Sequence, residues 1–312
     1  MSHEPSTLSP DTRGPSDDGP ARITRVGIVA KPGLTDTAVE LTAVTAWLDA
    51  RGIESVVEDE TSKMADLRSR PRASRDDLPA RVDLMLVFGG DGTLLGMADR
   101  IAQADREIPI LGVNFGTLGF LTEISASELL SSLEAALDGR AIIEARMMLR
   151  SRVERAGRTD VDRIVLNDVA VTGGSLSRIV EFSVSVGGEF VARFNADGLI
   201  ISSPTGSTAY NLSAGGPIVH PAVDAMVLNP IAPHTLTNRP IVIPADADVA
   251  IQPVLQRAGD EAFVTFDGQS GLQLENGDVV HIQRARRPMR LVRGSARSYY
   301  EVLRTKLRWA ER

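Results

Sequence analysis

The chain has 312 residues, which is enough for two domains of ordinary size. Its hydrophobic content of 43% is ordinary for a globular protein, and no stretch approaches the roughly 18 uninterrupted apolar residues of a membrane span, so no membrane partner is indicated. The net charge of −7 disfavours a non-specific nucleic-acid binder, and the absence of cysteine excludes disulfides and thiolate metal sites, which makes the cytoplasm the expected compartment.

The start of the chain predicts a tail followed by a β-α-β unit. Residues 1–20 are rich in Ser, Pro, Asp and Gly and lack the apolar middle of a secretory signal, so we expect a disordered tail. Hydrophobic patterns at 23–30, 35–50 and 53–58 predict a strand, a helix and a second strand. The arginine-rich segment 62–80 contains two prolines, and we interpret it as a loop or frayed helix over the site, or else as a solvated insertion.

The next elements predict a ligand-facing loop in a parallel, Rossmann-like sheet. An apolar run at 82–88 ends in Gly89-Gly90-Asp91-Gly92, and a helical pattern follows over 93–104. Strand, tight turn and helix in this order place the turn where open α/β sheets bind ligands. A strand at 108–113 and a helix at 127–137 complete an α/β domain, which we bound at residues 21–140.

The second half of the chain predicts a β-rich domain over residues 141–290. Its short apolar runs are separated by Gly, Asn and Asp, and one helical stretch interrupts them. In the final segment, 291–312, Tyr300, Leu303 and Leu307 recur at helical spacing, which predicts a helix that packs one face on the first domain. The predicted strands are 147–153, 164–172, 179–186, 198–202, 241–243, 249–254, 263–266 and 279–282, and the two helices are 208–214 and 298–309.

Two small motifs carry side chains suited to binding a sugar or phosphate. Asp91 is a carboxylate held between glycines at the end of an apolar strand, although a plain β-turn is the alternative for a lone Asp-Gly pair. Asn167 and Asp168 offer an amide and a carboxylate that can grip ribose hydroxyls, and the alternative is an ordinary turn before a strand. Neither a Walker A pattern nor GxGxxG occurs, so any phosphate site must be built differently.

These motifs resemble those of a known kinase family. Gly89 to Thr93 is similar to the glycine-aspartate signature shared by NAD kinases, diacylglycerol and sphingosine kinases and 6-phosphofructokinases. The run 197–217, DGLIISSPTGSTAYNLSAGGP, is much more specific and resembles the long second signature of NAD kinases. Asn167-Asp168 resembles their Asn-Glu/Asp motif, and Leu118-Gly119-Phe120 resembles their loop beneath the adenine. The resemblance covers roughly residues 23 to 309.

The resemblance implies a fold, a reaction and an assembly. The fold is an α/β domain plus a β-sandwich, with the active site between them. The reaction is phosphate transfer from ATP, or from polyphosphate, to the 2′-hydroxyl of the adenosine ribose of NAD, which makes NADP. Asp91 is the base implied for that hydroxyl, and Mg²⁺ is expected to travel on the ATP phosphates without a dedicated protein metal site. The family forms homodimers and homotetramers.

The resemblance also implies a set of site residues. Asp197 corresponds to an acidic contact to the nicotinamide side that a neighbouring subunit can supply, and Gly96 stands where many family members carry arginine, which puts the donor preference in question. The implied NAD contacts are Asp91, Gly92, Phe120, Asn167, Asp168, Arg178, Asn195, Asp197, Thr205, Thr208, Ala209, Tyr210, Asn211, Leu212, Ser213 and Gln269, and the implied phosphate contacts are Gly89, Gly90, Gly92 and Thr93.

Two rival functions share some of these features. A lipid kinase shares the glycine-aspartate turn and a two-domain arrangement, but the run 197–217 argues against it. A dinucleotide sensor without turnover would retain the binding residues, and the intact Asp91 favours an enzyme instead. His220 has no partner motif, so we interpret it as structural and not as a catalytic base.

Overall fold

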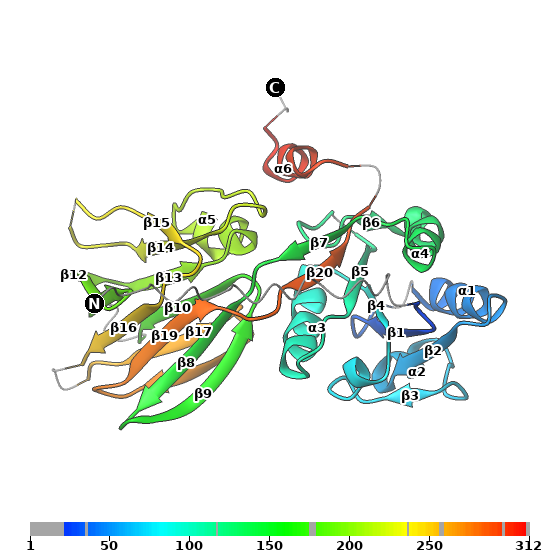
Figure 1. Ribbon diagram of the computed structural model, residues 1–312, viewed down its shortest axis with the longest axis horizontal. Coiled ribbons are helices and arrows are strands. Elements are labelled where there is room, and N and C mark those ends of the chain that lie inside the picture. The colour runs from blue at the N-terminus through cyan, green and yellow to red at the C-terminus, as the bar shows by residue number, and fades with distance from the viewer. Residues whose placement is uncertain are drawn as a thin grey trace, which may run out of the picture.

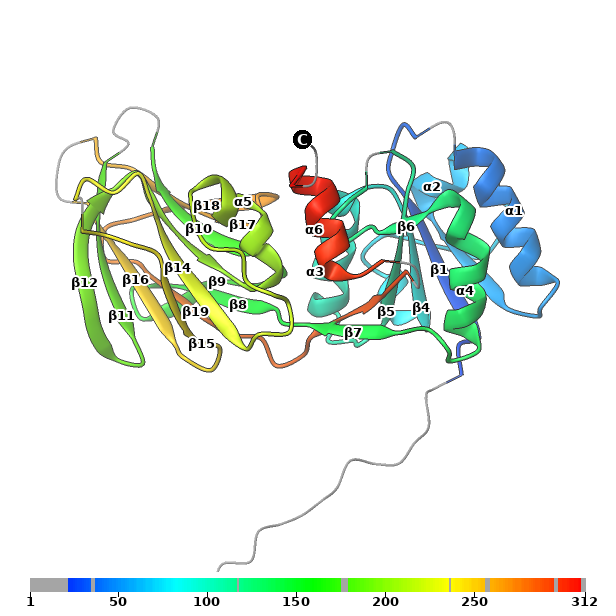
Figure 2. The ribbon, with the colours of Figure 1, turned by 90° about the horizontal axis from the view of Figure 1, so that it is seen from above.

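The structure is a computed structural model that describes residues 22–34, 37–116, 118–174, 179–235, 237–255, 259–294 and 297–309. It contains two domains side by side, with the helix α6 between them (Figures 1 and 2). No helix in these ranges is both long and apolar enough to cross a membrane.

The first domain is built on an eight-stranded sheet in the order β3-β2-β1-β4-β5-β20-β7, with β6 paired to β5. All neighbours in it are parallel except β20 and β7. The strands are β1 (Arg25–Ala30), β2 (Glu54–Glu58), β3 (Arg72–Ala73), β4 (Leu84–Phe88), β5 (Pro109–Asn114), β6 (Ile124–Ser125), β7 (Ile143–Arg146) and β20 (Met289–Val292).

Helices cover both faces of this sheet, as the buried apolar strands require. On one face, α1 (Ala38–Asp49) and α4 (Leu129–Leu137) pack on alternate strand residues such as Leu84 and Leu86. On the other face, α3 (Asp91–Gln103) packs on the intervening residues, including Met85 and Val87. The same cluster contains Met148, Leu166 and Ala285 of the second domain, so α3 lies at the junction between the domains.

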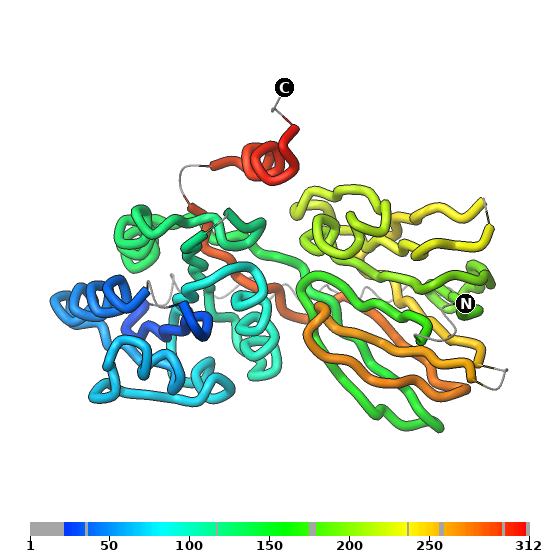
Figure 3. The backbone as a smooth tube through the Cα atoms, turned by 180° about the vertical axis from the view of Figure 1, so that it is seen from behind, coloured from blue at the N-terminus to red at the C-terminus, as the bar shows by residue number. Residues whose placement is uncertain are grey.

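The second domain is a β-sandwich of two six-stranded antiparallel sheets (Figure 3). Alternate residues of both sheets form one apolar core, with Phe182, Ile201 and Val264 among its buried members. One sheet has the order β15-β14-β13-β10-β17-β18, and the other has the order β12-β11-β16-β19-β8-β9. The strands are β8 (Leu149–Arg155), β9 (Arg158–Val165), β10 (Asp168–Gly173), β11 (Val180–Val186), β12 (Glu189–Ala196), β13 (Gly198–Ser202), β14 (Ala225–Ile231), β15 (Ile241–Pro244), β16 (Val249–Val254), β17 (Ala262–Phe266), β18 (Ser270–Leu274) and β19 (Val279–Arg284).

The structure places two strands differently from the expected domain limits. β7 begins after the boundary expected at residue 140 and β20 begins before the one expected at 290, yet both extend the first sheet beside β5. The reason is that β20 supplies the missing parallel neighbour of β5, and β7 then covers its outer edge. The chain therefore crosses between the domains at about Met147 and again just before Met289.

The arginine-rich segment 62–80 is more ordered than predicted. It contains the end of α2 (Asp59–Met64), the edge strand β3 and the short helix η2 (Leu78–Ala80). Its arginines pair with acids of the first domain: Arg70 with Asp49 of α1, and Arg75 with Glu58 of β2. Turns and loops connect these short elements, so the segment is a loop that also forms the far edge of the sheet, next to β2.

Two other sequence predictions also need correction. The strand predicted at 164–172 is broken at Leu166 and Asn167 into β9 and β10, which lie in different sheets. The terminal helix α6 (Tyr299–Leu307) forms as predicted, but it buries Val302 and Leu303, whereas Tyr300 is 60% exposed.

Candidate active site

Asp91 is the first residue of α3, directly after β4 and the Gly89-Gly90 turn. Gly90 is the helix N-cap and has no side chain, so the free amides of the first turn stay open to a ligand. A carboxylate here is stabilised by the positive end of the helix dipole. Gly92 is exposed and Thr93 is half-buried, so the predicted phosphate-facing residues line the same turn.

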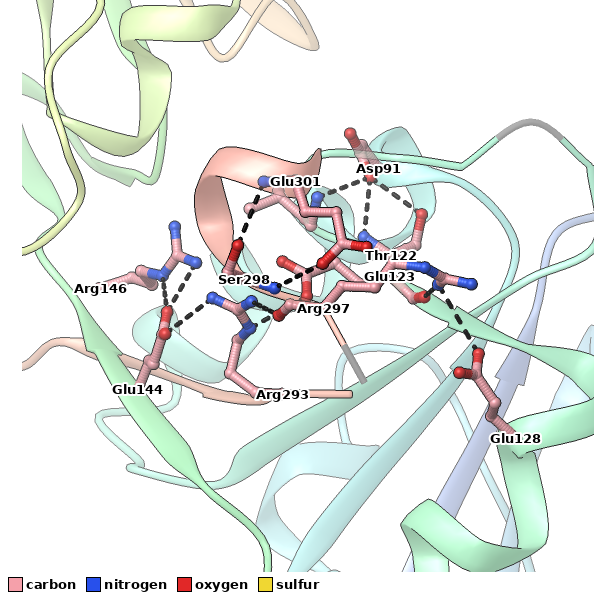
Figure 4. A network of polar contacts seen from close by, with 11 residues as sticks. Asp91, Thr122, Glu123, Glu128, Glu144, Arg146, Arg293, Arg297, Ser298 and Glu301 are labelled. Atoms are coloured by element: carbon pink, nitrogen blue, oxygen red, sulfur yellow. Dashed lines mark hydrogen bonds and ion pairs between the residues drawn. The ribbon is translucent and has the colours of Figure 1, made fainter. Parts of the chain in front are cut away.

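The Asp91 carboxylate is held by the loop that follows β5. Its Oδ1 accepts hydrogen bonds from the amides of Leu121 at 3.1 Å and Thr122 at 3.0 Å, and from the Thr122 hydroxyl at 2.9 Å. Its Oδ2 accepts one from the amide of Phe120 at 2.8 Å. Three consecutive amides thus fix the position of one carboxylate, as Figure 4 shows in part.

Gly119 makes this close approach possible. A Cβ atom on Gly119 would lie 2.1 Å from Asp91 Oδ1 and 2.3 Å from the Thr122 hydroxyl. Both distances are far inside van der Waals contact, so any side chain at position 119 would push the loop and the carboxylate apart. The Leu118-Gly119-Phe120 motif therefore has a physical reason in the contact with Asp91.

The Asn167-Asp168 pair lies in a turn between β9 and β10 that is held by a third carboxylate. Asp267 accepts hydrogen bonds from the amides of Leu166, Asn167 and Asp168 at 2.9, 2.7 and 3.0 Å. The sequence analysis missed Asp267. Asp267-Gly268 directly follows the apolar strand β17, and Asp91-Gly92 follows the apolar strand β4 after two glycines. The same signal, an Asp-Gly pair after a strand, could have found it.

Asp168 is almost completely buried, with 5% of its surface exposed. Burial raises the pKa of Asp168 to about 7, repulsion from Asp267 adds to the rise, and a hydrogen bond from the backbone of Tyr210 opposes it. Burial also raises the pKa of Asp267, and its three amide donors oppose that rise. A carboxyl group that changes charge near neutral pH is typical of a functional site.

The glycine-rich run packs directly on this turn. Ser203 donates its amide to the carbonyl of Asn167 at 2.9 Å and its hydroxyl to that of Leu166. A Cβ on Gly206 would lie 2.1 Å from the Asn167 carbonyl oxygen, so only glycine permits this contact. The short helices η4 (Thr205–Thr208) and α5 (Tyr210–Ser213) follow, and Tyr210 is 44% exposed.

One predicted NAD contact within the run has a structural role instead. Asn211 is fully buried, and its Nδ2 donates to the carbonyls of Ser207 and Pro217 at 3.0 Å. The side chain of Asn229 donates to its Oδ1 at 3.1 Å. These bonds use the whole Asn211 amide to close the loop, so its side chain is not presented to a ligand. The exposed side chains of Tyr210 and Ser213 remain available.

Gln269 connects the two domains at the site. Its Nε2 donates to the carbonyl of Gly92 at 3.1 Å, so the Asp267 turn reaches the start of α3. A Cβ on Gly96 would lie 3.5 Å from Gln269 Oε1, so the position where the family resemblance implies arginine faces the same bridge. The structure thus brings together the Asp91 turn, the Asn167-Asp168 turn and Gln269 from three distant parts of the chain.

Two predicted site residues do not join this group, and a third is not among the described residues. Asp197 precedes β13, and Asp168 pairs with Ser202 at the other end of that strand, so the two acids are separated by its length, roughly 17 Å. Asn195 lies beside Asp197 at the end of β12 and is exposed. Arg178 lies outside the described residues. Within one chain, Asn195 and Asp197 are remote from Asp91.

The remaining aromatic and histidine predictions have clear positions. Phe120 is half-buried in the loop that holds Asp91, with the Lys306 amine of α6 5.5 Å from its ring centre. His220 accepts a hydrogen bond from the amide of Ala222 on Nδ1 and packs edge-on against Tyr299, 4.6 Å between ring centres. These contacts give His220 a structural role, as the sequence suggested.

Sequence comparison agrees with this arrangement. The profile of the ATP-NAD kinase N-terminal domain family matches residues 26–141, and that of the ATP-NAD kinase C-terminal domain family matches residues 166–294. The chain belongs to the NAD kinase family. It is 47% identical to the NAD kinase of Geotalea daltonii and 46% identical to that of Geobacter sulfurreducens, and each alignment covers 92% of this chain and 99% of the relative.

Solved structures of the family show the same fold. Yeast NADH kinase, solved in complex with NADH, superimposes with a TM-score of 0.84 at 23% identity, over 94% of this chain and 89% of that one. An NAD kinase from Archaeoglobus fulgidus, solved in complex with ATP, gives a TM-score of 0.71 at 24% identity, over 90% and 98%. The predicted α/β domain with a β-sandwich is confirmed, and family membership decides against the lipid-kinase alternative.

The raised pKa of Asp168 predicts a pH-dependent effect of Asp168→Asn on stability. Between pH 4 and 7 the carboxyl ionises in the unfolded chain but stays neutral in the folded one, so its contribution to the free energy of unfolding declines, by roughly 4 kcal/mol in total. Asparagine cannot ionise, so Asp168→Asn does not lose this part of the free energy of unfolding as the pH rises. We therefore expect Asp168→Asn to raise the melting temperature at pH 8 more than at pH 4.5, measured by calorimetry without ligands.

Asp162→Asn is the control for this experiment. A hydrogen bond from Arg150 lowers the pKa of Asp162, so the charged carboxylate stabilises the fold. Removing this charge in Asp162→Asn therefore gives no gain in melting temperature at high pH. An equal change in melting temperature for Asp168→Asn at both pH values would contradict the raised pKa.

Proposed function

We infer that this chain acts in the cytoplasm as an NAD kinase, transferring phosphate from ATP to the 2′-hydroxyl of the adenosine ribose of NAD to make NADP. The observation that carries this inference is the clasp of Asp91 by the amides of Phe120, Leu121 and Thr122, at the helix N-terminus of an NAD kinase-family fold. The run from Ser203 to Ser213 supports it, because it packs on the Asn167-Asp168 turn.

Asp91 orients the acceptor hydroxyl in this mechanism. A carboxylate has about four acceptor positions, and Oδ2 carries only one of the four hydrogen bonds to Asp91, so it has room to accept one from the ribose 2′-hydroxyl. Phosphate transfer through a loose transition state depends on alignment and charge neutralisation more than on early proton removal. Asp91 therefore fixes the direction of attack and accepts the proton late.

The dinucleotide lies along the second domain in this proposal. Asn167 and Asp168 hold ribose hydroxyls, and Thr205 with the residues of η4 and α5 provides backbone donors for phosphates or ring nitrogens. Phe120 and Tyr210 offer aromatic surface to the adenine. In its ionised form Asp168 accepts hydrogen bonds from hydroxyls, and its burial keeps those bonds away from water.

Mg²⁺ enters with ATP. The donors at the Asp91 turn are one carboxylate with a free acceptor position and the backbone of a glycine loop. This set fits an ion that keeps most of its ligands from phosphate and water, as Mg²⁺ does. When bound, the ion would supply charge neutralisation on the transferred phosphate, while Asp91 orients the acceptor.

A direct assay with Asp91→Asn tests the proposed function. Purified protein given NAD, ATP and Mg²⁺ is expected to form NADP, read through an NADP-specific dehydrogenase, and Asp91→Asn is expected to lose at least a hundredfold in kcat while its melting temperature stays above the assay temperature. The control is Asp105→Asn, beyond the end of α3, whose exposed partner is Arg287. Wild-type turnover in Asp91→Asn would refute its role, and no NADP with either ATP or polyphosphate would refute the kinase.

The chain forms a homodimer or homotetramer in this proposal. The edge strands β12 and β15 lie together and expose apolar side chains, among them Phe190 at 66% and Val242 at 52%. Such a patch on two sheet edges is typical of an association surface. Asp197 directly follows β12, one of these edge strands, so association along that edge would explain why this acid is remote from Asp91 in its own chain.

Light scattering tests the assembly. The wild type is expected at two or four times the mass of one chain, and Val242→Glu is expected to shift it toward the monomer because the charge cannot be buried in an apolar interface. Ile142→Glu, at an apolar residue of the first domain that is 66% exposed, is the control and leaves the assembly unchanged. A monomeric wild type at micromolar concentration would overturn the proposal.

A further inference from the structure

A buried ion network lies directly behind the loop that holds Asp91 (Figure 4). Glu123 follows Thr122 in the chain, and its side chain is 4% exposed. It meets Arg293, 8% exposed, with 2.9 Å between Oε2 and Nε. The last residue of the Asp91 clasp is therefore covalently next to one member of a buried ion pair.

Arg293 connects three separate segments. Besides this ion-pair contact with Glu123, which lacks hydrogen-bond geometry, it donates from Nη1 to Glu144 of β7 at 2.8 Å and from Nη2 to the carbonyl of Arg297 at 2.7 Å. Arg146, 3% exposed, completes the group through Glu144 at 2.7 Å. Two arginines and two glutamates balance in charge, which is the condition for keeping ions in a protein interior.

The segment leading to α6 holds the same loop from another side. Arg297 donates to the backbone carbonyl of Glu123 at 2.9 Å and lies 3.7 Å from the carboxylate of Glu128. The next residue, Ser298, caps α6, and α6 carries Lys306 to the ring of Phe120. The segment from Phe120 to Glu123 therefore contacts Asp91 on one side and Arg293 and Arg297 on the other.

This arrangement matters for the orientation of Asp91. The clasp works through the direction of three backbone amides, and a backbone shift of a few tenths of an ångström would lengthen those hydrogen bonds. Buried ion pairs with several partners resist such shifts, because separating the ions leaves a charge uncompensated. Burial raises the pKa of Glu123, Arg293 and Arg146 oppose the rise, and Glu144 adds to it.

We propose that Glu123 and Arg293 are positioning residues for phosphate transfer, holding the Phe120–Thr122 backbone so that Asp91 stays aligned with the acceptor hydroxyl. The proposal rests on the role proposed for Asp91 in NAD phosphorylation. Neither residue touches substrate in this account, and both act through the loop. Their loss therefore lowers kcat more than it changes the KM for NAD or ATP.

Arg293→Lys and Glu123→Gln test this with little change in volume. Lysine keeps the charge but lacks the planar fork, so it cannot contact Glu123, Glu144 and the Arg297 carbonyl together. We expect kcat to fall about tenfold to a hundredfold, with both KM values within about threefold of wild type and the melting temperature above the assay temperature. Arg290→Lys, on β20 three residues before Arg293 but paired with Glu107 at the surface, is the control and keeps wild-type kcat.

A double-mutant cycle separates positioning from general stability. Thr122→Val removes one hydrogen bond to Asp91, so Thr122→Val and Arg293→Lys loosen the same clasp, and their losses in kcat are expected to be less than additive. Additive losses, an unchanged kcat in Arg293→Lys, or no effect of Thr122→Val would overturn the proposal. Turnover in Asp91→Asn would refute the role of Asp91 in the proposed function. Loss of turnover in Asp91→Asn without loss in the Glu123 and Arg293 variants would refute only the positioning proposal.

Discussion

The Asp91 carboxylate accepts hydrogen bonds from three consecutive backbone amides and one hydroxyl, and the rest of the site is arranged around this contact. The contact joins the end of β4 to the loop after β5, two neighbouring strands of a parallel sheet. The carboxyl ends of such strands are where α/β folds bind ligands. A carboxylate fixed by the backbone keeps its direction without help from substrate, which is what an in-line phosphate transfer requires.

A second carboxylate plays the matching part in the other domain. Asp267 holds the amides of the Asn167-Asp168 turn, and Gln269, two residues later, reaches the carbonyl of Gly92. Each domain thus uses an acid to shape one loop, and the two loops meet at the start of α3. The apolar cluster that α3 shares with both domains keeps this junction in place.

Much of the fold and of the candidate site was predictable from local sequence patterns, and the wrong or missing predictions have physical causes. The apolar run 82–88, the Gly89–Gly92 turn and the helical pattern 93–104 are continuous in sequence, so the local pattern indicated strand, turn and helix around Asp91. The run 197–217 is also continuous, and it carried the family resemblance. The pairing of β20 with β5 joins residues about 180 positions apart, and no local pattern reports it. Asn211 was predicted as a ligand contact from the family resemblance of its run, but only the folded loop shows that its amide binds the carbonyls of Ser207 and Pro217. The network behind Glu123 likewise depends on contacts between distant segments.

Gly119→Ala is the measurement that tests the central claim most directly. The added methyl would lie 2.1 Å from Asp91 Oδ1 and must displace the clasp, whereas Gly116→Ala, in the same loop, would meet nothing closer than 3.8 Å. Both variants are assayed for NADP formation at saturating NAD and ATP, with melting temperatures recorded. The account predicts a loss in kcat of about a hundredfold or more for Gly119→Ala and wild-type turnover for Gly116→Ala. Wild-type turnover in a folded Gly119→Ala protein would contradict it.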